Sequence, residues 1–405
     1  MLIALLSTSA VAVPPRAYGG TERFVADLAE ALVARGHDVT VYATGDSRPA
    51  GHLRWRFGHA YWPPNPQREL EHVTWAWGEI AGGQFDVVHI NGPESLIAAE
   101  RVPIPTVLTI HHSHSVETSA LMRSADKVHL VAISRRQAEL APELAVSAVI
   151  HHGLSIRMYP AGRGAGGYAA FLGRLAPEKA PHVAIDAAAA AGVPLRLAGP
   201  SWGEIPGHAA YFQESVKPRL ERSGSGVTWV GEVDHPGKVA LVGDARALLV
   251  PLEWEEPFGL VMIEAMLVGT PVIAFARGSA PEIIDEGVTG FLVHDAGEMA
   301  ARLAEVDRID RRACRKRALE RWNADRMAED YERLYRRVAG HEEPVGRMEP
   351  ALVAPAQVRW GMMEGSGEET HRPRAGAREP AGALVRGGAR RGGAPGLVGR
   401  RGRAS

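Results

Sequence analysis

The sequence predicts an α/β protein made of two doubly wound units, and three observations carry this prediction. Short apolar runs alternate with amphipathic segments along most of the 405 residues, which favours parallel sheets covered by helices. A glycine-rich stretch at 161–167 interrupts the alternation, which then starts again. The length suits two domains, and 45% hydrophobic with 23% charged residues is ordinary for a globular protein.

The first unit begins with a β-α-β pattern. Its strand, helix and second strand are expected at Leu2–Leu6, Thr21–Ala34 and Val39–Tyr42. Apolar side chains recur every three or four residues along the helix, Thr21 suits the N-cap, and Gly36 suits a left-handed stop. At the Gly19-Gly20 turn before this helix, the backbone can approach a ligand closely. Met1–Ala10 is apolar but lacks the basic start of a signal peptide, so we expect a buried strand there.

Further apolar runs complete the two sheets. In the first unit, strands are expected at Asp86–Ile90, Thr106–Ile110 and Val128–Ile133. In the second unit, the expected strands are Tyr168–Leu172, Leu195–Ala198, Val227–Val230, Ala247–Val250 and Val272–Phe275. The helices expected between them are Ala180–Ala191, Pro236–Val242, Leu260–Val268 and Ala280–Ile284. The passage His52–Trp77, rich in Trp and Pro, fits neither pattern. Ligands of such sheets bind beyond the carboxyl ends of the strands, here in a cleft between the units.

These patterns divide the chain into four parts. Residues 1–160 are expected to form one domain and 161–321 a second, with a helical pattern over 299–338. Residues 322–340 form a further helix that repeats aromatic and aliphatic side chains. The last part, 341–405, is rich in Gly, Ala, Pro and Arg without periodicity, and we expect it to be disordered.

The charge balance excludes some classes of partner. A net charge of -1 and a pI of about 7.0 give no overall field toward nucleic acid, so no nucleic-acid partner is expected. No run approaches the roughly 20 apolar residues of a membrane span. We expect a cytoplasmic protein, and a peripheral contact with the inner face of the membrane stays open. The single cysteine, Cys314, lies among arginines and is expected on a helix surface, which fits a reducing compartment.

The most informative segment runs from Glu256 to Glu264. Two carboxylates lie eight positions apart around a Phe-Gly step that opens an apolar helix. A helix beginning near Leu260 points free N–H groups and its positive dipole end at whatever precedes it, which favours a diphosphate. The two carboxylates can hold hydroxyls on either side of that diphosphate, on a sugar and on a ribose. The alternative is a buried, capped helix whose acidic start has only an electrostatic reason.

A pair of cations follows the first predicted strand of the second unit. Arg174 and Lys179 lie in the segment Gly173-Arg174-Leu175-Ala176-Pro177-Glu178-Lys179, at the cleft edge of the sheet. Two cations there can neutralise a leaving diphosphate. Arg and Lys on a loop are ordinarily solvent-exposed residues without a binding role, but their occurrence together with Glu256 and Glu264 favours a binding site.

These segments resemble the retaining, bacterial group 1-type glycosyltransferases of family 4, which have the GT-B architecture. The likeness covers Met1 to about Gly340. Its most specific part is Glu-Pro-Phe-Gly-Leu-Val-Met-Ile-Glu-Ala-Met from Glu256, continuing through Gly-Thr-Pro-Val to Gly-Ser-Ala-Pro-Glu at Glu282. The supporting matches are the Arg174/Lys179 loop, Gly19-Gly20-Thr21-Glu22 and Thr109-Ile110-His111. The resemblance implies two Rossmann-like domains facing across a cleft, with the helix 322–340 crossing back onto the first.

The resemblance also assigns residues to a donor site. Glu256 would contact the donor sugar, Glu264 the ribose, and Arg174 with Lys179 the two phosphates, while His111 would lie near the transferred sugar. The implied donor-binding set is Gly19, Gly20, Arg174, Lys179, Glu256, Phe258, Gly259, Leu260, Glu264 and Glu282. The implied catalytic set is His111, Glu256, Arg174 and Lys179. Glu282 is equally well explained as an acid at a helix start.

The chemistry of such a site fits these residue types. A glycosyl transition state places negative charge on the departing diphosphate, which cations and a helix dipole stabilise. No cofactor and no metal are therefore expected. Zinc at His111, His112 and His114, with His151 and His152 as further ligands, is disfavoured, because adjacent residues of one strand cannot easily converge on an ion. Ser155 stands where many relatives have Asp, which puts local hydrogen bonds there in doubt.

We therefore expect a hexosyltransferase that moves a sugar from a nucleotide donor, expected to be UDP-linked, to an unidentified acceptor. A polysaccharide, a lipid and a small metabolite all stay open as acceptors. A nucleotide-sugar epimerase and a non-catalytic sugar-nucleotide-binding protein are the alternatives, and turnover with an added acceptor separates them. A dinucleotide-binding dehydrogenase fits poorly, because the first turn lacks Gly-x-Gly-x-x-Gly.

Overall fold

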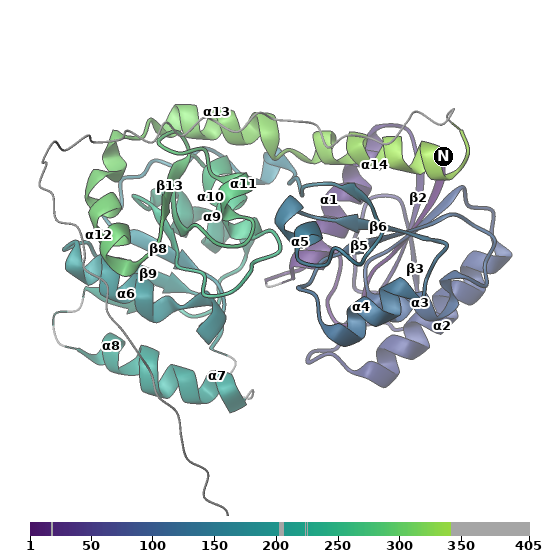
Figure 1. The fold of residues 1–405 in the computed structure, drawn as a ribbon, viewed down its shortest axis with the longest axis horizontal. Coiled ribbons are helices and arrows are strands. Elements are labelled where there is room, and N and C mark those ends of the chain that lie inside the picture. Colours follow the sequence, from purple (N-terminus) through teal and green to yellow (C-terminus); the bar gives the residue numbers. More distant parts are fainter. Residues whose placement is uncertain (18, 202–205, 223, 225, 342–405) are drawn as a thin grey trace, which may run out of the picture. The chain divides into compact units, whose positions relative to one another are not determined.

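The computed structural model describes residues 1–341 apart from 18, 202–205, 223 and 225. These residues belong to one unit, Met1–Leu352, which contains two parallel sheets with helices around them (Figure 1). The predicted α/β class with two doubly wound halves is confirmed. The disorder predicted for the tail concerns residues that, except for His341, lie outside the described part of the chain.

The first sheet has the strand order β3-β2-β1-β4-β5-β6-β7, and its neighbouring strands are parallel. Its strands are β1 (Leu2–Leu6), β2 (Asp38–Ala43), β3 (His52–Trp55), β4 (Val87–Ile90), β5 (Thr106–Ile110), β6 (Val128–Ala132) and β7 (Val146–Val149). Its helices are α1 (Gly20–Ala34), α2 (Pro66–Gly82), α3 (Leu96–Ala99), α4 (Val116–Arg123) and α5 (Arg135–Glu139). The order reverses between β1 and β4, which is where such sheets bind ligands at the carboxyl ends of their strands.

The second sheet has the order β10-β9-β8-β11-β12-β13, again parallel. Its strands are β8 (Ala169–Leu172), β9 (Leu195–Ala198), β10 (Val227–Trp229), β11 (Leu248–Val250), β12 (Val272–Phe275) and β13 (Gly290–Val293). Its helices are α6 (Pro181–Ala190), α7 (Pro206–Tyr211), α8 (Lys217–Glu221), α9 (His235–Asp244), α10 (Leu260–Leu267), α11 (Ala280–Ile283), α12 (Ala296–Glu305) and α13 (Arg311–Arg321). The last helix, α14 (Ala324–Val338), returns to the first sheet.

The helix α14 packs against α1 and completes the core on one face of the first sheet. Its buried face includes Met327, Tyr331 and Tyr335, which join the apolar cluster that α1 forms with β1 and β2. The Tyr331 hydroxyl lies 2.7 Å from the Thr109 hydroxyl, and the Tyr335 hydroxyl lies 2.6 Å from Nδ1 of His89. Two strands of the first sheet are thereby tied to the last helix of the described chain.

Several elements were not predicted from the sequence. The passage His52–Trp77 contains β3 and most of α2. The helix α2 begins at Pro66, after the N-cap Asn65, whose side-chain oxygen accepts from the N–H of Arg68. The helical stretch expected over 299–338 is three helices with breaks between them. The expectation that Cys314 lies on a helix surface was wrong. Its side chain is buried against the Thr289 carbonyl at 3.8 Å, because the flanking arginines point to other sides of α13.

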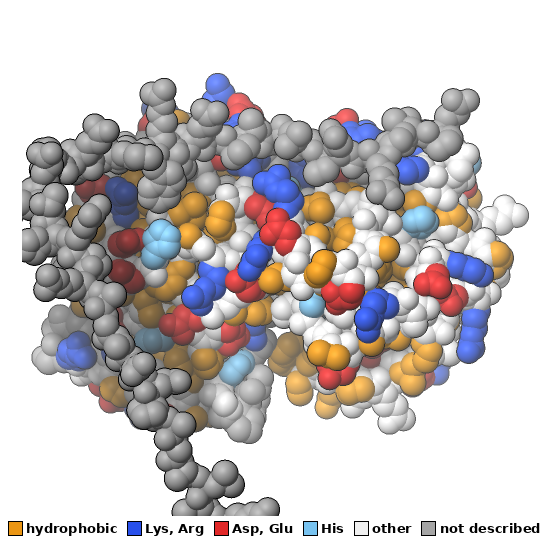
Figure 2. Space-filling model, viewed as in Figure 1, with side chains coloured by type: hydrophobic (Ala, Val, Ile, Leu, Met, Phe, Trp, Pro, Cys, Tyr) orange, Lys and Arg blue, Asp and Glu red, His pale blue; other side chains and the backbone are white. Residues whose placement is uncertain are grey.

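The surface carries both signs of charge. On the face that Figure 2 presents, acidic and basic side chains lie among one another, in keeping with the net charge of -1. In the described part of the chain, no helix is both long and apolar enough to pass through a membrane.

Candidate active site

The start of α10 is shaped by backbone as much as by side chains. The loop after β11 ends at Gly259, whose φ of 78° lies in the left-handed region that favours glycine. A Cβ atom there would come within 2.6 Å of the Met262 side chain. Ser279 braces the same loop, because its N–H donates to the Glu256 carbonyl at 3.0 Å and its hydroxyl to the Phe258 carbonyl at 2.6 Å. The N-terminus of α10 is thus held open toward the loop.

Glu256 is brought together with one of the predicted cations. Its side chain is only 9% exposed, and the Lys179 ammonium donates to its Oε2 atom. The indole N–H of Trp254 donates to the same oxygen at 2.9 Å, and Lys179 lies 4.7 Å from the centre of that ring. Trp254 therefore contacts both members of the pair, a role that the sequence did not indicate.

The second predicted cation lies in the same loop but pairs elsewhere. Arg174 lies 3.0 Å from the Glu178 carboxylate within the turn that leads to Lys179. It also lies near His112 of the first domain, whose pKa is lowered by burial although Glu94 raises it. The Arg174/Lys179 loop therefore faces both domains.

The second carboxylate of the pair, Glu264, is held by residues that the sequence did not single out. It is 6% exposed, and its Oε1 atom accepts from the Tyr159 hydroxyl at 2.9 Å and from the Lys238 ammonium. Burial raises the pKa of Glu264, but the charge of Lys238 and these hydrogen bonds outweigh it and leave the pKa below its usual value. Glu264 is thus a charged acceptor in a buried setting.

The Gly19-Gly20 turn approaches α10 from the first domain. A Cβ atom at Gly20 would lie 3.5 Å from the Leu260 side chain, the first residue of α10. Gly19 has a φ of 156°, and a Cβ atom there would lie 2.8 Å from Pro15. The structure therefore brings this predicted turn to the predicted helix start, as close as side chains would normally pack.

His111 lies at the carboxyl end of β5 and is fixed by Asn91. Its Nε2–H donates to the Asn91 amide oxygen at 2.9 Å, while the Asn91 amide donates to the Leu6 carbonyl at 3.0 Å. The His111 ring stacks on His152 at 5.4 Å between centres, and His152 contacts Phe258 at 4.9 Å. Burial, followed by the neighbouring His152, lowers the pKa of His111 well below its usual range, so the ring is neutral at pH 7.

Glu282 joins the two domains. Its carboxylate accepts the backbone N–H groups of Arg135 and Arg136 at 2.9 and 2.7 Å, which begin α5 of the first domain. The His151 ring donates to it at 2.9 Å, and Arg136 also reaches Glu255 at 2.9 Å. Burial raises the pKa of Glu282, but these donors outweigh it and leave the pKa below its usual value. A contact between Glu282 and a donor sugar stays a prediction.

The histidines considered for zinc have other partners. His114 lies 3.0 Å from the Gln137 carbonyl, His111 contacts Asn91, and His151 contacts Glu282. Among the described residues, no group of three His, Cys, Asp or Glu side chains is arranged to hold a metal ion.

Comparisons with known proteins bear on this site directly. The profile described as glycosyl transferases group 1 matches residues 164–321, and the profile described as glycosyltransferase family 4 matches residues 18–156. The chain belongs to the group 1 glycosyltransferases of family 4. The family resemblance and the GT-B fold predicted from the sequence are thereby confirmed, and neither the epimerase nor the binding-protein alternative is favoured.

Sequence similarity to curated relatives covers part of the length of each relative. It is 31% identical to the D-inositol 3-phosphate glycosyltransferase of Mycolicibacterium vanbaalenii over 55% of this chain and 60% of that protein. It is 29% identical to the protein of the same name from Mycolicibacterium smegmatis over 61% of this chain and 64% of that protein. The matches thus span about three fifths of the length of these relatives.

Solved structures show the same fold over nearly their whole length. AviGT4, a glycosyltransferase involved in avilamycin A biosynthesis, is 25% identical with a TM-score of 0.63, and the match covers 84% of this chain and 98% of that one. Anabaena HepE, solved in complex with UDP and glucose, is 19% identical with a TM-score of 0.64, covering 82% of this chain and 99% of that one. The second likeness concerns the fold alone.

Proposed function

We propose that this protein transfers a sugar from a UDP-sugar to a hydroxyl group of an acceptor, with retention of the anomeric configuration. The observation that carries the proposal is the contact between Lys179 and Glu256 at the start of α10, which joins two segments 77 positions apart. A cation, a carboxylate and free helix N–H groups are the three partners that a sugar diphosphate needs. The glycosyltransferase family and the UDP complex of a protein with this fold support the same assignment.

In this proposal each group acts on one part of the donor. Lys179 and Arg174 bind the diphosphate together with the N–H groups of Gly259 and Leu260. Glu256 accepts hydroxyls of the sugar when Lys179 turns toward phosphate, and Glu264 accepts the ribose hydroxyls through the oxygen that Tyr159 and Lys238 leave free. The two cations and the helix N–H groups stabilise the leaving diphosphate more strongly than the bound substrate, because the negative charge on the diphosphate grows as its bond to the sugar breaks.

Retention follows from attack on the face that the diphosphate leaves. The acceptor oxygen bonds to the anomeric carbon, the bond from that carbon to the phosphate oxygen breaks, and the leaving phosphate takes the acceptor proton. We propose that Arg174, Lys179 and α10 supply the charge neutralisation for this step without a metal ion. His111 is neutral, and its Nε2–H is donated to Asn91, so in this proposal its Nδ1 accepts a hydrogen bond from a sugar hydroxyl and the ring carries no positive charge.

The test is donor turnover with a panel of UDP-, GDP- and ADP-sugars, scored by release of nucleoside diphosphate and by thermal stabilisation. D-Inositol 3-phosphate is the first acceptor to add, since the curated relatives are named for it. Lys179→Ala should lower turnover at least about 100-fold, because it removes a charge-assisted contact that strengthens in the transition state. Lys217→Ala, a half-exposed lysine of α8 paired with Glu221, is the control and should leave turnover unchanged. Equal turnover in the two variants contradicts the proposal.

A further inference from the structure

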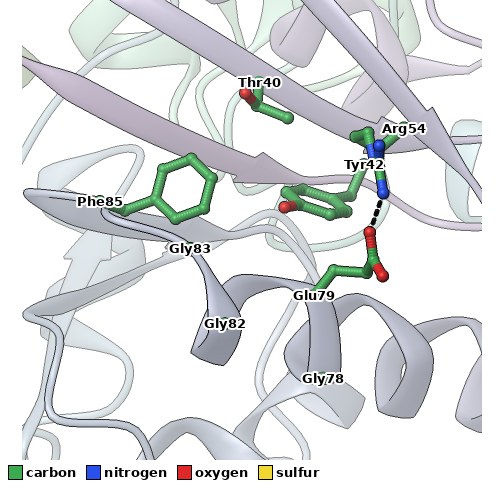
Figure 3. Close-up of a pocket in the computed structure, with 8 residues that line it drawn as sticks. All are labelled: Thr40, Tyr42, Arg54, Gly78, Glu79, Gly82, Gly83 and Phe85. Atoms are coloured by element: carbon green, nitrogen blue, oxygen red, sulfur yellow. Dashed lines mark hydrogen bonds and ion pairs between the residues drawn. The ribbon is translucent and has the colours of Figure 1, made fainter.

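A cavity that is open to solvent lies in the first domain, among residues that belong to no part of the proposed donor site. It has a volume of about 420 Å³ and is lined by Thr40 and Tyr42 of β2, Arg54 of β3, Gly78, Glu79 and Gly82 of α2, and Gly83 and Phe85 beyond that helix (Figure 3). This volume falls in the usual range for small-molecule sites, which is about 300 to 1,000 Å³.

The hydroxyl of Tyr42 points into this cavity without a partner. The residue is only 3% exposed, and its ring is packed between Trp75 and Phe85, with centres 5.9 and 6.4 Å away. Figure 3 shows the hydroxyl directed toward Phe85 and Gly83, and no described residue hydrogen-bonds to it. The oxygen lies on the open side of the cavity, where water or a ligand hydroxyl can bond to it. Burial also raises the pKa of Tyr42 to about 12, so the hydroxyl stays a donor.

Two helical glycines keep the cavity open. Gly78 and Gly82 lie one turn apart on α2, and a Cβ atom at either would meet nothing within 4 Å. Packing therefore does not demand glycine there, although glycine is less favourable than alanine within a helix. Any larger side chain at these positions would project into the space that the cavity occupies.

The lining is uncharged as a whole but rich in hydrogen-bonding groups. Arg54 and Glu79 form an ion pair at its edge, so their charges compensate each other. Beside this pair stand the hydroxyls of Thr40 and Tyr42, and opposite them the ring of Phe85 (Figure 3). The compensated pair offers no net charge to an anionic or cationic ligand, whereas a neutral ligand with several hydroxyls can bond to both of its members.

We propose that this cavity binds a neutral sugar ring, separately from the donor site. A pyranose presents a face of C–H groups that packs on an aromatic ring, and a rim of hydroxyls that bonds to an Arg–Glu pair and to other hydroxyls. The phenol of Tyr42 donates to one ring hydroxyl in place of water. The proposal does not depend on the transfer reaction, because none of the lining residues takes part in it.

The experiment is saturation-transfer NMR of the full chain with methyl glycosides of glucose, galactose, mannose and N-acetylglucosamine, with saturating UDP present throughout. At least one glycoside should bind with a Kd on the order of 1 mM. Gly82→Leu fills the cavity and should weaken this binding about tenfold or more, whereas Ala81→Leu, its neighbour on the exposed side of α2, should not. Tyr42→Phe should weaken it about three- to tenfold, which is the effect of one neutral hydrogen bond.

Thermal melting of each variant shows whether it remains folded, and glucose 6-phosphate serves as the charged probe. Binding of neutral glycosides that Gly82→Leu abolishes and Ala81→Leu retains supports the proposal. The proposal is overturned if no glycoside binds the wild-type protein, if Gly82→Leu and Tyr42→Phe leave binding unchanged, or if only the phosphorylated sugar binds. Donor turnover in Gly82→Leu should equal that of the wild type, so a failed sugar site and a failed transferase assignment give different results.

Discussion

Trp254 holds two proposed donor-binding side chains at once. Its indole N–H donates to Glu256, and its ring lies under the Lys179 ammonium. Hydrogen bonds to charged groups contribute about 1.5 to 3 kcal/mol, and a cation over an aromatic ring adds about 0.5 to 1 kcal/mol or more. The residue therefore positions the pair without being expected to touch the reacting atoms itself.

Trp254→Phe keeps an aromatic ring near Lys179 but removes the N–H. We expect the KM for the donor to rise about tenfold with a smaller change in kcat, since the hydrogen bond fixes Glu256 before the sugar binds. Trp254→Leu, which also removes the ring, should raise it further. Steady-state kinetics of donor turnover measure KM and kcat. An unchanged KM in Trp254→Phe would show that the indole N–H does not position Glu256.

The ion pair between Lys238 and Glu264 predicts a pH-dependent stability. Because the pKa of Glu264 in the folded state lies below its usual 4.5, the carboxylate stabilises the fold above that pH. This contribution is lost as the pH falls through the folded-state pKa. Lys238→Met leaves a buried charge unpaired, which should reduce stability at pH 7 by about 3 kcal/mol.

The melting temperature of Lys238→Met should therefore fall by several degrees at pH 7, and the difference from the wild type should shrink below about pH 4. Lys217→Met, which disrupts a half-exposed pair with Glu221, should change the melting temperature little at either pH. A deficit of the same size at both pH values would mean that Lys238 acts through packing.

At the scale of elements, α1 carries a buried acid, Asp27, whose pKa is raised, whereas the pKa of Glu264 is lowered. Asp27 is 2% exposed and lies 3.6 Å from Arg23. Burial raises its pKa to about 7 despite Arg23, so the folded protein binds this proton more tightly than the unfolded chain. Stability should consequently fall as the pH rises from about 4 to about 7.

Asp27→Asn removes this titration while keeping the shape of the side chain. The variant should melt above the wild type at pH 8, and the advantage should vanish below about pH 3, where Asp27 is protonated in both states. Asp38→Asn, at a half-exposed acid of β2, serves as the control. If Asp27→Asn melts lower at pH 8, the charged form with Arg23 is the stable one and the assigned pKa is wrong.

The elements that build the site were predictable because their signals are local. A strand, a Phe-Gly step and an apolar run predicted α10, and the loop after a strand predicted the place of Lys179. Lys238 and Tyr159 were not predicted. Lys238 lies on α9 and Tyr159 in the segment between the two sheets, and no sequence spacing relates either of them to Glu264. The strand β3 is short and exposed at a sheet edge, so it lacks the apolar run that marks a buried strand. Cys314 shows the same limit, since flanking charges do not reveal which side of a helix is buried.

At the scale of the whole molecule, the contacts of Glu282 connect the second domain with α5 and His151 of the first. With the donor bound between the two halves, as proposed above, such a bridge favours the arrangement in which the halves are closed on the donor. Glu282→Gln keeps an acceptor but turns an amide N–H toward the backbone N–H groups of Arg135 and Arg136. Like groups then face each other, and the bridge should weaken by about 1 to 3 kcal/mol.

We expect Glu282→Gln to raise the donor KM about tenfold and to lower thermal stabilisation by UDP, while the melting temperature without ligand changes little. The last expectation follows because each domain retains its own core. Glu221→Gln, at an exposed acid of α8, is the control and should match the wild type. Donor titration by calorimetry decides between two roles for Glu282. If it contacts the donor sugar directly, the variant should lose affinity for the UDP-sugar but keep it for UDP. If it acts as a bridge between domains, affinity for both ligands should fall together.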